Sequence, residues 1–447
     1  MLTRRSLLQG LLPAALAARP AAPRPNFIYV LTDDLGYGDL GCYGSRAIRT
    51  PRLDAMAREG VRFTQFYSGS SLCTPARASF ITGRYSPRVG RLIHPLQPTN
   101  DYGLPASEVT IAETLRGAGY TSACIGKWHL GHLPQFLPTN HGFDYWYGLP
   151  YSNDLKPLPL MRNLETLTTE VDQARLTDDY TKESVAFIER AAAAKKPFFL
   201  YLAHTMPHDP LHAPERFRGK SEGGLYGDVV ENIDWSMGEV LAALKRLNLD
   251  RETLVMFTSD NGPWWEGSAG PLRGRKAEQY EGGFRVPFIA RWPGRIAPGQ
   301  VCETPAMAIN MHPTFAALAG TRVDPAAGLD GRDMSSLLLG RTRACPNEIF
   351  LFFYREHLHA ARMGNWKLHL AALTRAPYMR LRAFREGGAE KRSEAKLPEP
   401  QLYDLSLDPY ESYNVAPEHP EVVRSITERV RAELAAYPEH VRKAQLI

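Results

Sequence analysis

The sequence predicts an α/β fold with a mostly parallel central sheet flanked by helices, followed by a small C-terminal α+β domain. Three observations predict this. Short apolar runs, each suited to a buried parallel strand, alternate with segments of helical periodicity. Polar residues follow each run directly, and in open α/β sheets ligands bind beyond the carboxyl ends of the strands. Beyond Leu339 the pattern changes to short strands and a terminal helix.

The elements of the first part follow from these apolar runs. Strands are predicted at 26–32, 120–125, 198–202 and 254–259. Helices are predicted at 76–82, 110–118, 180–194 and 229–247. Because strands and helices alternate, neighbouring strands should be parallel.

In the last part, strands are predicted at 349–354, 360–364 and 366–370, with a helix at 420–436. The charged segment 380–399 is predicted to be an exposed loop. The change of pattern divides the chain into an α/β domain at 25–340 and a C-terminal α+β subdomain at 341–447. A chain of 447 residues is long enough to bury a large core.

The bulk charge restricts the partners of the protein. A net charge of +5 fits an anionic substrate, but it is too small and too dispersed to indicate nucleic-acid binding. No long apolar run follows the first 20 residues, so we expect no membrane span in the mature chain.

Residues 1–24 have the pattern of a signal peptide. Arg4 and Arg5 precede an apolar segment, Leu7–Ala18, that ends in small residues. The paired arginines favour the twin-arginine route, with an ordinary secretory signal as the alternative. The protein is therefore expected to be exported, to the periplasm of a bacterium. Because the twin-arginine route exports folded proteins, modification in the cytoplasm could precede export.

The five cysteines are irregularly spaced and form no metal-binding pattern or disulfide framework. They are Cys42, Cys73, Cys124, Cys302 and Cys345. No essential disulfide is expected, and the pairing of the four besides Cys73 stays open.

The most informative segment surrounds Cys73, in the run Ser-Leu-Cys-Thr-Pro-Ala-Arg-Ala-Ser. Pro75 favours the first turn of a helix, which places Cys73 at or just before the helix start. Unpaired N–H groups and the positive end of the helix dipole favour an anion there. Arg77, one turn later, can face the same anion. A buried structural cysteine is the competing interpretation.

Two strand ends carry candidate metal ligands. Asp33 and Asp34 follow the first strand, and Asp260 and Asn261 follow the strand at 254–259. Four hard oxygen donors without histidine or thiol suit Ca²⁺ or Mg²⁺ rather than zinc. Solvated turns or helix caps are the alternative for each pair alone.

Candidate cationic and proton-transferring groups follow other strands. Lys127 and His129 come directly after the strand at 120–125, and His208 lies in a loop stiffened by prolines. Lys276 precedes a glycine pair on a loop from which it can reach an anion. Structural roles are preferred for His141, His204 and His212. An outer pocket could be lined by Tyr102, Asn153, Asp154, His357 and His359, for which surface roles fit equally well.

Together these segments resemble the sulfatase family, in the family's order. They are Thr32–Gly41, Cys73–Thr82, Gly126–Gly131, Thr258–Gly262, Tyr280–Gly283 and, near the C-terminus, Leu402–Leu405, Asp408–Pro409 and Asn414. Arylsulfatase A-like and N-acetylgalactosamine-6-sulfatase-like enzymes are the nearest subgroup. The resemblance runs from about Pro25 to the C-terminus. It implies an alkaline-phosphatase-like fold whose C-terminal domain has a four-stranded antiparallel sheet.

The resemblance implies a sulfuric ester hydrolase that cleaves aryl sulfates or sulfated sugars. A formylglycine-generating enzyme would oxidise Cys73 to Cα-formylglycine, and the aldehyde hydrate would attack sulfur to give a sulfated intermediate. Ala76 stands where many relatives carry serine, an accepted variant. The residues implied to bind one Ca²⁺, with Mg²⁺ less favoured, are Asp33, Asp34, Asp260, Asn261 and the modified Cys73.

The remaining site residues are implied to act on the sulfate group. Arg77 and Lys127 would hold the hydrate and a sulfate oxygen. Lys276 and His208 would contact the sulfate and its leaving oxygen, with His208, or else Lys276, as general acid. His129 would deprotonate the second hydroxyl of the sulfated hydrate.

Two alternatives remain open at this point. One is a formylglycine-dependent phosphate monoester or diester hydrolase, and the other is an inactive exported carbohydrate-binding relative. The sequence does not identify the alcohol half of the substrate, and a sulfated sugar is expected from the resemblance alone.

Overall fold

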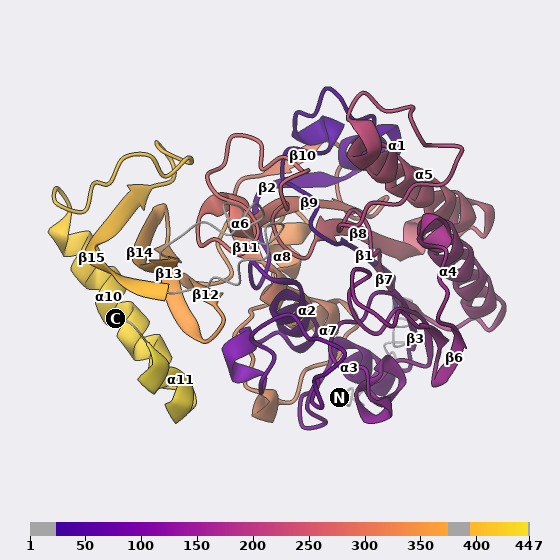
Figure 1. Cartoon of the computed structure of the whole chain (residues 1–447), viewed down its shortest axis with the longest axis horizontal. Helices are drawn as coiled ribbons and strands as arrows, with labels where there is room; N and C mark the ends of the chain where they lie inside the picture. The colour runs from indigo at the N-terminus through magenta and orange to yellow at the C-terminus, as the bar shows by residue number, and fades with distance from the viewer. Residues whose placement is uncertain (1–23, 374–393, 446–447) are drawn as a thin grey trace, which may run out of the picture.

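The computed structural model describes residues 24–373 and 394–445. Figure 1 shows a large α/β body built from the N-terminal three quarters of the chain and a smaller unit, orange to yellow, at the C-terminal end. The predicted signal peptide lies outside the described residues, apart from Arg24. Within the described part, no helix is long and apolar enough to cross a membrane.

Eleven strands of the described chain form the large sheet, in the order β10-β2-β9-β8-β1-β7-β3-β4-β5-β6, with β11 beside β2. Their bounds are β1 Asn26–Thr32, β2 Val61–Tyr67, β3 Thr121–Gly126, β4 Tyr145–Gly148, β5 Leu160–Arg162, β6 Glu165–Thr168, β7 Phe198–Ala203, β8 Thr253–Ser259, β9 Arg285–Arg291, β10 Gln300–Cys302 and β11 Ala306–Met307. The central strands β8, β1, β7 and β3 are parallel neighbours, while β9 runs antiparallel to β2 and β8. The prediction of a mostly parallel sheet is confirmed.

Helices cover both faces of this sheet, because successive side chains of a buried strand point to opposite faces. Ile28 and Val30 of β1 pack with α1 (Pro51–Glu59), α4 (Leu176–Ala193) and α5 (Gly224–Arg246). Phe27 and Tyr29 pack on the other face with α2 (Cys73–Thr82), α3 (Ile111–Gly117) and α7 (Met311–Leu318). Two shorter helices are α6 (Glu281–Phe284) and α8 (Ser335–Leu338).

The C-terminal unit contains the expected four-stranded antiparallel sheet. Its strands, in spatial order, are β12 Ile349–Tyr354, β13 His357–Met363, β14 Trp366–Leu373 and β15 Glu394–Asp404. The helices α10 (Pro420–Leu434) and α11 (Glu439–Ala444) follow it. Apolar residues of α10 are buried with those of β12 and β13 in one core cluster.

One sequence prediction in this unit is wrong. The segment predicted as a loop at 380–399 contains the first half of β15, in which Glu394 pairs with Leu373 of β14. Because β15 is an edge strand, it tolerates the charges that suggested a loop. For the same reason it tolerates Pro398 and Pro400. Residues 380–393 lie outside the described residues.

The two units share apolar packing. Tyr67, Phe284 and Ile309 of the large body lie in the same buried cluster as Phe350 and Phe352 of β12. The domain division at 340 stays a prediction, since the core is continuous across it.

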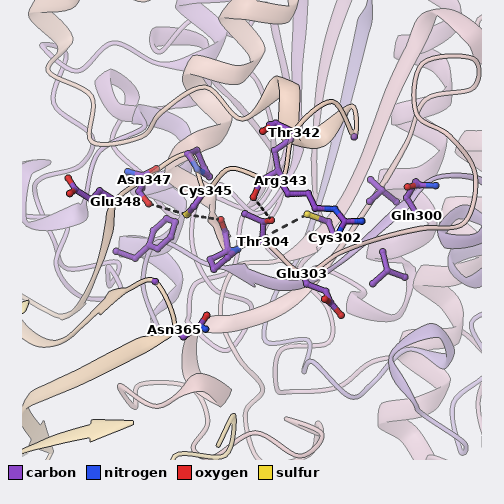
Figure 2. A pocket seen from close by; sticks show the side chains of 18 of the residues that line it. Gln300, Cys302, Glu303, Thr304, Thr342, Arg343, Cys345, Asn347, Glu348 and Asn365 are labelled. Carbon is purple, nitrogen blue, oxygen red and sulfur yellow. Dashed lines mark hydrogen bonds between the residues drawn. The ribbon is translucent and has the colours of Figure 1, made fainter. Parts of the chain in front are cut away.

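Where the units meet, a cavity of about 980 Å³ lies between β10 and the segment leading into β12 (Figure 2). Two thiols line it, Cys302 and Cys345, and the Cys345 sulfur donates to the Asn347 carbonyl oxygen at 3.0 Å. All five cysteines are free thiols in the structure.

Candidate active site

The carboxyl ends of β8, β1, β7 and β3 bring the predicted site segments to one edge of the sheet. Backbone hydrogen bonds continue the parallel pairing beyond the strands themselves. Asp260 N donates to Thr32 O at 3.0 Å, and Lys127 N donates to Ala203 O at 2.8 Å. The polar residues that follow these four strands therefore emerge side by side, as the sheet topology requires.

Cys73 is the first residue of α2 and is 2% exposed. Thr74, the next residue, donates through Oγ1 to the His129 carbonyl oxygen at 2.8 Å, which ties the helix start to the segment after β3. Burial raises the pKa of the Cys73 thiol to about 12, although the positive charges of Lys276 and Lys127 oppose the shift. An unmodified Cys73 would therefore be a neutral thiol and a poor nucleophile at neutral pH.

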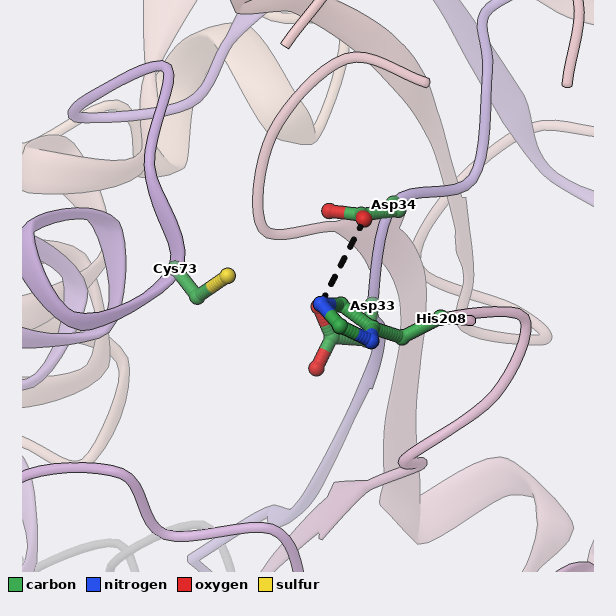
Figure 3. Close-up of side chains that lie close together, drawn as sticks. All are labelled: Asp33, Asp34, Cys73 and His208. Atoms are coloured by element: carbon green, nitrogen blue, oxygen red, sulfur yellow. Dashed lines mark ion pairs between the residues drawn. The ribbon is translucent and has the colours of Figure 1, made fainter. Parts of the chain in front are cut away.

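Cys73 lies beside an acidic pair and a histidine. One ligand atom each from Asp33, Asp34, Cys73 and His208 falls within 4.8 Å of the others. Figure 3 shows the Cys73 side chain pointing from the start of α2 toward the space beside Asp33, Asp34 and His208. The structure thus places the candidate nucleophile against the candidate metal ligands.

Three buried cations face these carboxylates. Arg77 Nη2 lies 3.2 Å from Asp33 Oδ2, and Lys127 Nζ forms an ion pair with the same oxygen. Lys276 Nζ lies 2.7 Å from the Asp34 carboxylate. Burial opposes ionisation of Asp33, but Lys127, His208 and Arg77 outweigh it and hold its pKa well below the usual range. Asp33 is therefore ionised although its carboxylate is desolvated.

Asp260 and Asn261 join the cluster from the end of β8. Asp260 Oδ1 accepts from Asp34 N at 3.2 Å, and Asn261 Nδ2 donates to Asp34 Oδ1 at 2.7 Å. Burial raises the pKa of Asp260, and the neighbouring charge of Asp33 raises it further.

These residues fit a divalent metal ion. Within the described residues, the buried oxygens Asp33 Oδ1 and Asn261 Oδ1 have no hydrogen-bond partner. Each is a hard oxygen acceptor, the ligand type that Ca²⁺ and Mg²⁺ prefer. A dication among Asp33, Asp34 and Asp260 would also relieve the repulsion between their charges.

The hydrogen bonds of His129 define its tautomer. Its Nε2 lies 3.0 Å from the Leu96 carbonyl oxygen, which only accepts, so Nε2 carries the proton. Its Nδ1 is buried and has no partner among residues 24–373 and 394–445. Burial lowers the pKa of His129 well below its usual value, and the charges of Lys127 and Arg77 lower it further. His129 is thus a neutral imidazole with an unprotonated Nδ1, the form that a general base requires.

His208 lies nearer the solvent than His129. Its Nδ1 donates to the Asp209 carbonyl oxygen at 2.5 Å, and its Nε2 lies 3.7 Å from Asp34 Oδ2. Its side chain is 14% exposed. Because Nδ1 already carries a proton, Nε2 carries one only in the imidazolium form. Burial lowers the pKa of His208 and the charge of Lys276 lowers it further, whereas Asp34 opposes the shift. The Nε2 atom is the side of the ring that a group entering from outside can reach.

The comparisons with known proteins decide the family. A family model described as Sulfatase matches residues 25–321, and a model of the C-terminal region of aryl-sulfatase matches residues 346–445. The chain belongs to the sulfatase family.

The sulfatase is 39% identical to human arylsulfatase A over 94% of this chain and 89% of that protein. It is 40% identical to rat N-acetylgalactosamine-6-sulfatase over 81% of this chain and 75% of that protein. Among solved structures, the PsFucS1 sulfatase from Pseudoalteromonas sp. superposes with a TM-score of 0.84 and 28% identity, covering 93% of this chain and 91% of that one. The fold predicted from the sequence is confirmed, and the chain is an enzyme that hydrolyses sulfate esters.

The family implies a bound metal ion and a formylglycine, and the clustered residues of the sulfatase offer a place for both. The six predicted catalytic side chains do not all meet directly. Arg77, Lys127, Lys276 and His208 contact the acidic pair. His129 lies behind them, against Leu96 and the start of α2.

The residues suggested for an outer pocket lie in different surroundings. Tyr102 lies under the guanidinium of Arg91, 3.8 Å from its ring centre, and its hydroxyl contacts His94. Asn153 is fully buried and donates to Gln173 Oε1 at 3.0 Å, so its surface role is wrong.

The other outer-pocket residues also differ among themselves. Asp154 is exposed. His357 and His359 both contact Glu394 in the C-terminal sheet.

Two site contacts were missed in the sequence. Lys127 Nζ donates to Ser152 Oγ at 3.0 Å, which fixes the lysine from the segment after β4. The Leu96 carbonyl orients His129 and is a backbone group, which no side-chain pattern can reveal. The one feature of the sequence that could have suggested Ser152 is its position next to Asn153, a candidate for the outer pocket.

Proposed function

We propose that the sulfatase hydrolyses a sulfate monoester at Cys73 after conversion of this residue to Cα-formylglycine, with Ca²⁺ held by Asp33, Asp34, Asp260 and Asn261. The observation that carries the proposal is the position of Cys73 at the start of α2, against Asp33, Asp34 and His208. The hydrate of the formylglycine supplies an oxygen nucleophile that the neutral thiol lacks.

The charges of the site suit a sulfate ester. Arg77, Lys127 and Lys276 balance the three aspartates one for one. A dication therefore gives the site a net positive charge, which attracts the anionic ester and stabilises charge that develops during transfer. Arg77 and Lys127 orient the nucleophile, and Lys276 binds a sulfate oxygen.

Two histidines move the protons. His208, in its imidazolium form, donates the proton on Nε2 to the leaving oxygen, because it is the histidine that faces the acidic pair and the solvent. The negative charge of Asp34 favours this form, against the effect of burial. His129 accepts a proton at Nδ1 from the hydroxyl of the modified Cys73, while the Leu96 carbonyl holds its other nitrogen protonated. The two steps of the proposed hydrolysis are transfer of the sulfate to the hydrate and its release from the hydrate. The first step requires an acid for the leaving oxygen, and the second requires a base for the remaining hydroxyl.

The proposed substrate is a sulfated glycan or an aryl sulfate. This proposal is supported by two relatives whose names state a substrate class. They are N-acetylgalactosamine-6-sulfatase, with 40% sequence identity, and arylsulfatase A, with 39%. A further structure, of Ps i-CgsB in complex with k-i-k-neocarrahexaose, superposes with a TM-score of 0.78 at 29% identity and covers 92% of each chain. We propose export through the twin-arginine signal to the periplasm, after a formylglycine-generating enzyme has modified Cys73.

The test is the mass of the tryptic peptide 63–77 from protein made in a host that contains a formylglycine-generating enzyme. We expect loss of the Cys73 sulfur and its replacement by an aldehyde or hydrate. The same protein should cleave an aryl sulfate faster than the matching aryl phosphate, which distinguishes a sulfatase from a phosphoesterase. Cys73→Ala should fold with unchanged circular dichroism and hydrolyse neither. Wild-type turnover by Cys73→Ala, or an unmodified thiol in active protein, would refute the mechanism.

A further inference from the structure

The loop that carries Lys276 is held at both ends by one residue of the C-terminal unit. Glu411 accepts a hydrogen bond from Glu281 N through Oε2 at 2.7 Å. The Glu411 carbonyl oxygen accepts another from Arg273 Nη1 at 2.6 Å. Arg273 and Glu281 bound the loop, and Gly282 N donates to Arg273 O at 2.7 Å. Glu411 therefore ties together the two ends of the loop, which are themselves bonded to each other.

Charged groups of β14 complete this attachment. Lys367 Nζ lies 2.9 Å from Glu281 Oε1 and 3.1 Å from Glu411 Oε1, and His369 Nε2 lies 2.6 Å from Glu411 Oε1. None of these side chains has exposed surface. The ring of His369 also packs against Tyr280, with ring centres 5.1 Å apart. One buried lysine thus joins a carboxylate of the loop to a carboxylate of the C-terminal unit.

The turn that presents Glu411 is built by a sequence motif that takes no part in the proposed hydrolysis. Asp408 Oδ2 accepts from Ser412 N and Tyr413 N at 2.7 and 2.8 Å, and Asn414 Oδ1 accepts from Leu402 N at 2.9 Å. Glu411 itself has φ +55°, an uncommon conformation for a residue other than glycine. These bonds hold the turn in a shape that directs the Glu411 side chain inward.

At its other side the loop contacts the active site directly. Lys276 N donates to Pro263 O at 3.0 Å, and Ala277 N donates to Ser71 O at 2.9 Å, two residues before Cys73. There is little room for the loop to shift, because a Cβ added to Gly282 would lie 2.2 Å from the Gly274 carbonyl oxygen. Any displacement of the loop ends would therefore reach Lys276.

We propose that Glu411, with Lys367 and His369, is a positioning group for Lys276, so that the C-terminal unit completes the sulfate site. Glu411 acts through the loop and contacts no reacting atom. The inference rests on the proposed role of Lys276 in binding a sulfate oxygen. It gives the Asp408–Asn414 motif a function in catalysis rather than in the stability of the C-terminal sheet alone.

A double-mutant cycle tests this, with Glu411→Gln measured in the wild type and in Lys276→Ala. Glutamine keeps an oxygen for Glu281 N but removes the charge that faces Lys367 and His369. A displacement of about 1 Å at a catalytic group can cost about 10- to 100-fold in rate, so we expect that loss of kcat/KM on an aryl sulfate. In Lys276→Ala the same change should cost less than about twofold, because the group that it positions is gone.

The control is Asp234→Asn. Asp234 is a buried carboxylate of α5 that accepts from Arg52 N and Leu53 N of α1, as Glu411 accepts from Glu281 N. It should lower the unfolding temperature and leave kcat/KM unchanged. Equal losses from Glu411→Gln in both Lys276 backgrounds would overturn the proposal, as would unchanged kcat/KM in the single variant. If Glu411→Gln does not fold, His369→Gln enters the same cycle with the same expectation.

Binding of inorganic sulfate separates this proposal from the proposed function. Sulfate binding can be measured by calorimetry, without turnover, on the wild type, Glu411→Gln, Lys276→Ala and the double variant. We expect weaker binding in Glu411→Gln and no further weakening when it is added to Lys276→Ala. Equal dissociation constants for wild type and Glu411→Gln would overturn the positioning role even if the enzyme hydrolysed sulfate esters as proposed. If the enzyme cleaved aryl phosphate instead of aryl sulfate, the proposed function would be refuted. The positioning role of Glu411 could then still be tested by the same double-mutant cycle with aryl phosphate as the substrate.

Discussion

The guanidinium of Arg77 lies 2.9 Å from Asp260 Oδ2, and neither side chain has any exposed surface. The same guanidinium donates to the Lys127 carbonyl oxygen at 2.8 Å and reaches Asp33 Oδ2 at 3.2 Å. One side chain of α2 therefore joins the segments that follow β8, β1 and β3 at the edge of the sheet. Removing Arg77 would leave buried carboxylates unpaired, which is costly. We therefore expect this arginine to contribute to the stability of the fold as well as to substrate binding.

Arg77→Met should therefore destabilise the protein and abolish hydrolysis. Leaving Asp33 and Asp260 without this partner is expected to lower the free energy of unfolding by about 3–5 kcal/mol, measured by urea denaturation. The control is Arg246→Met at the end of α5, which removes an exposed pair with Glu189 and should cost about 1 kcal/mol or less. Equal losses for the two variants would contradict the structural role of Arg77.

Calcium should raise the unfolding temperature, and a chelator should remove both this increase and the activity. A ligand at 100 times its dissociation constant stabilises the native state by about 2.7 kcal/mol. Asp33→Asn and Asn261→Ala should each abolish the calcium-dependent increase. The first removes the negative charge of a candidate ligand, and the second removes an oxygen that has no hydrogen-bond donor in the described structure. Asp178→Asn, which changes a surface pair with Arg216, should keep it. A calcium response that survives in Asp33→Asn would place the ion elsewhere.

The central strands could be predicted because their sequences are continuous apolar runs with polar ends. The run at 26–32 coincides with β1, and that at 198–202 is one residue shorter than β7. Among the strands that were missed, β2 and β9 lack this signal. β2 alternates buried and half-buried residues, while β9 contains Pro287 and begins and ends with arginine. They pair with each other across more than two hundred residues, a contact that local pattern cannot reveal.

The candidate site was predictable to the extent that its residues sit in short motifs at strand ends. What the sequence could not provide is the set of groups that orient them from a distance. Lys127 depends on Ser152, and His129 on the Leu96 carbonyl. The Lys276 loop depends on Glu411, more than one hundred residues away. These residues become partners only because the tertiary fold brings them together. Neither Ser152 nor Glu411 belongs to a sequence motif that would have marked it as a candidate site residue.

His208→Ala should discriminate between substrates by their leaving groups. An alkyl sulfate needs a proton on its departing oxygen, so kcat/KM should fall about 10²- to 10⁴-fold. For 4-nitrophenyl sulfate, whose phenolate leaves unprotonated, the loss should be much smaller. The control is His212→Ala, half-buried in the same loop, which should leave the ratio of the two substrates unchanged. A uniform loss on both substrates would show that His208 is not the general acid.

Glu394→Gln should lower stability in a pH-dependent way, because its partner His357 titrates. His357 Nδ1 lies 2.6 Å from Glu394 Oε2, and this hydrogen bond raises the pKa of His357. Burial opposes ionisation of Glu394, but hydrogen bonds from His357 and His359 outweigh it and lower its pKa to about 2. The carboxylate stabilises the fold above its unfolded pKa of about 4.3, and this contribution is lost as the pH falls toward the folded value.

The imidazolium of His357 stabilises the folded state below its unfolded pKa of about 6.5. This stabilisation is lost as the pH rises through the raised pKa of the folded state. The difference in unfolding free energy between wild type and Glu394→Gln should therefore be larger at about pH 5 than at about pH 8, measured by urea denaturation. Glu348→Gln is the matched control, because its partner Arg429 does not titrate in this range. A difference for Glu394→Gln that stayed constant with pH would show that His357 is not charged by this contact.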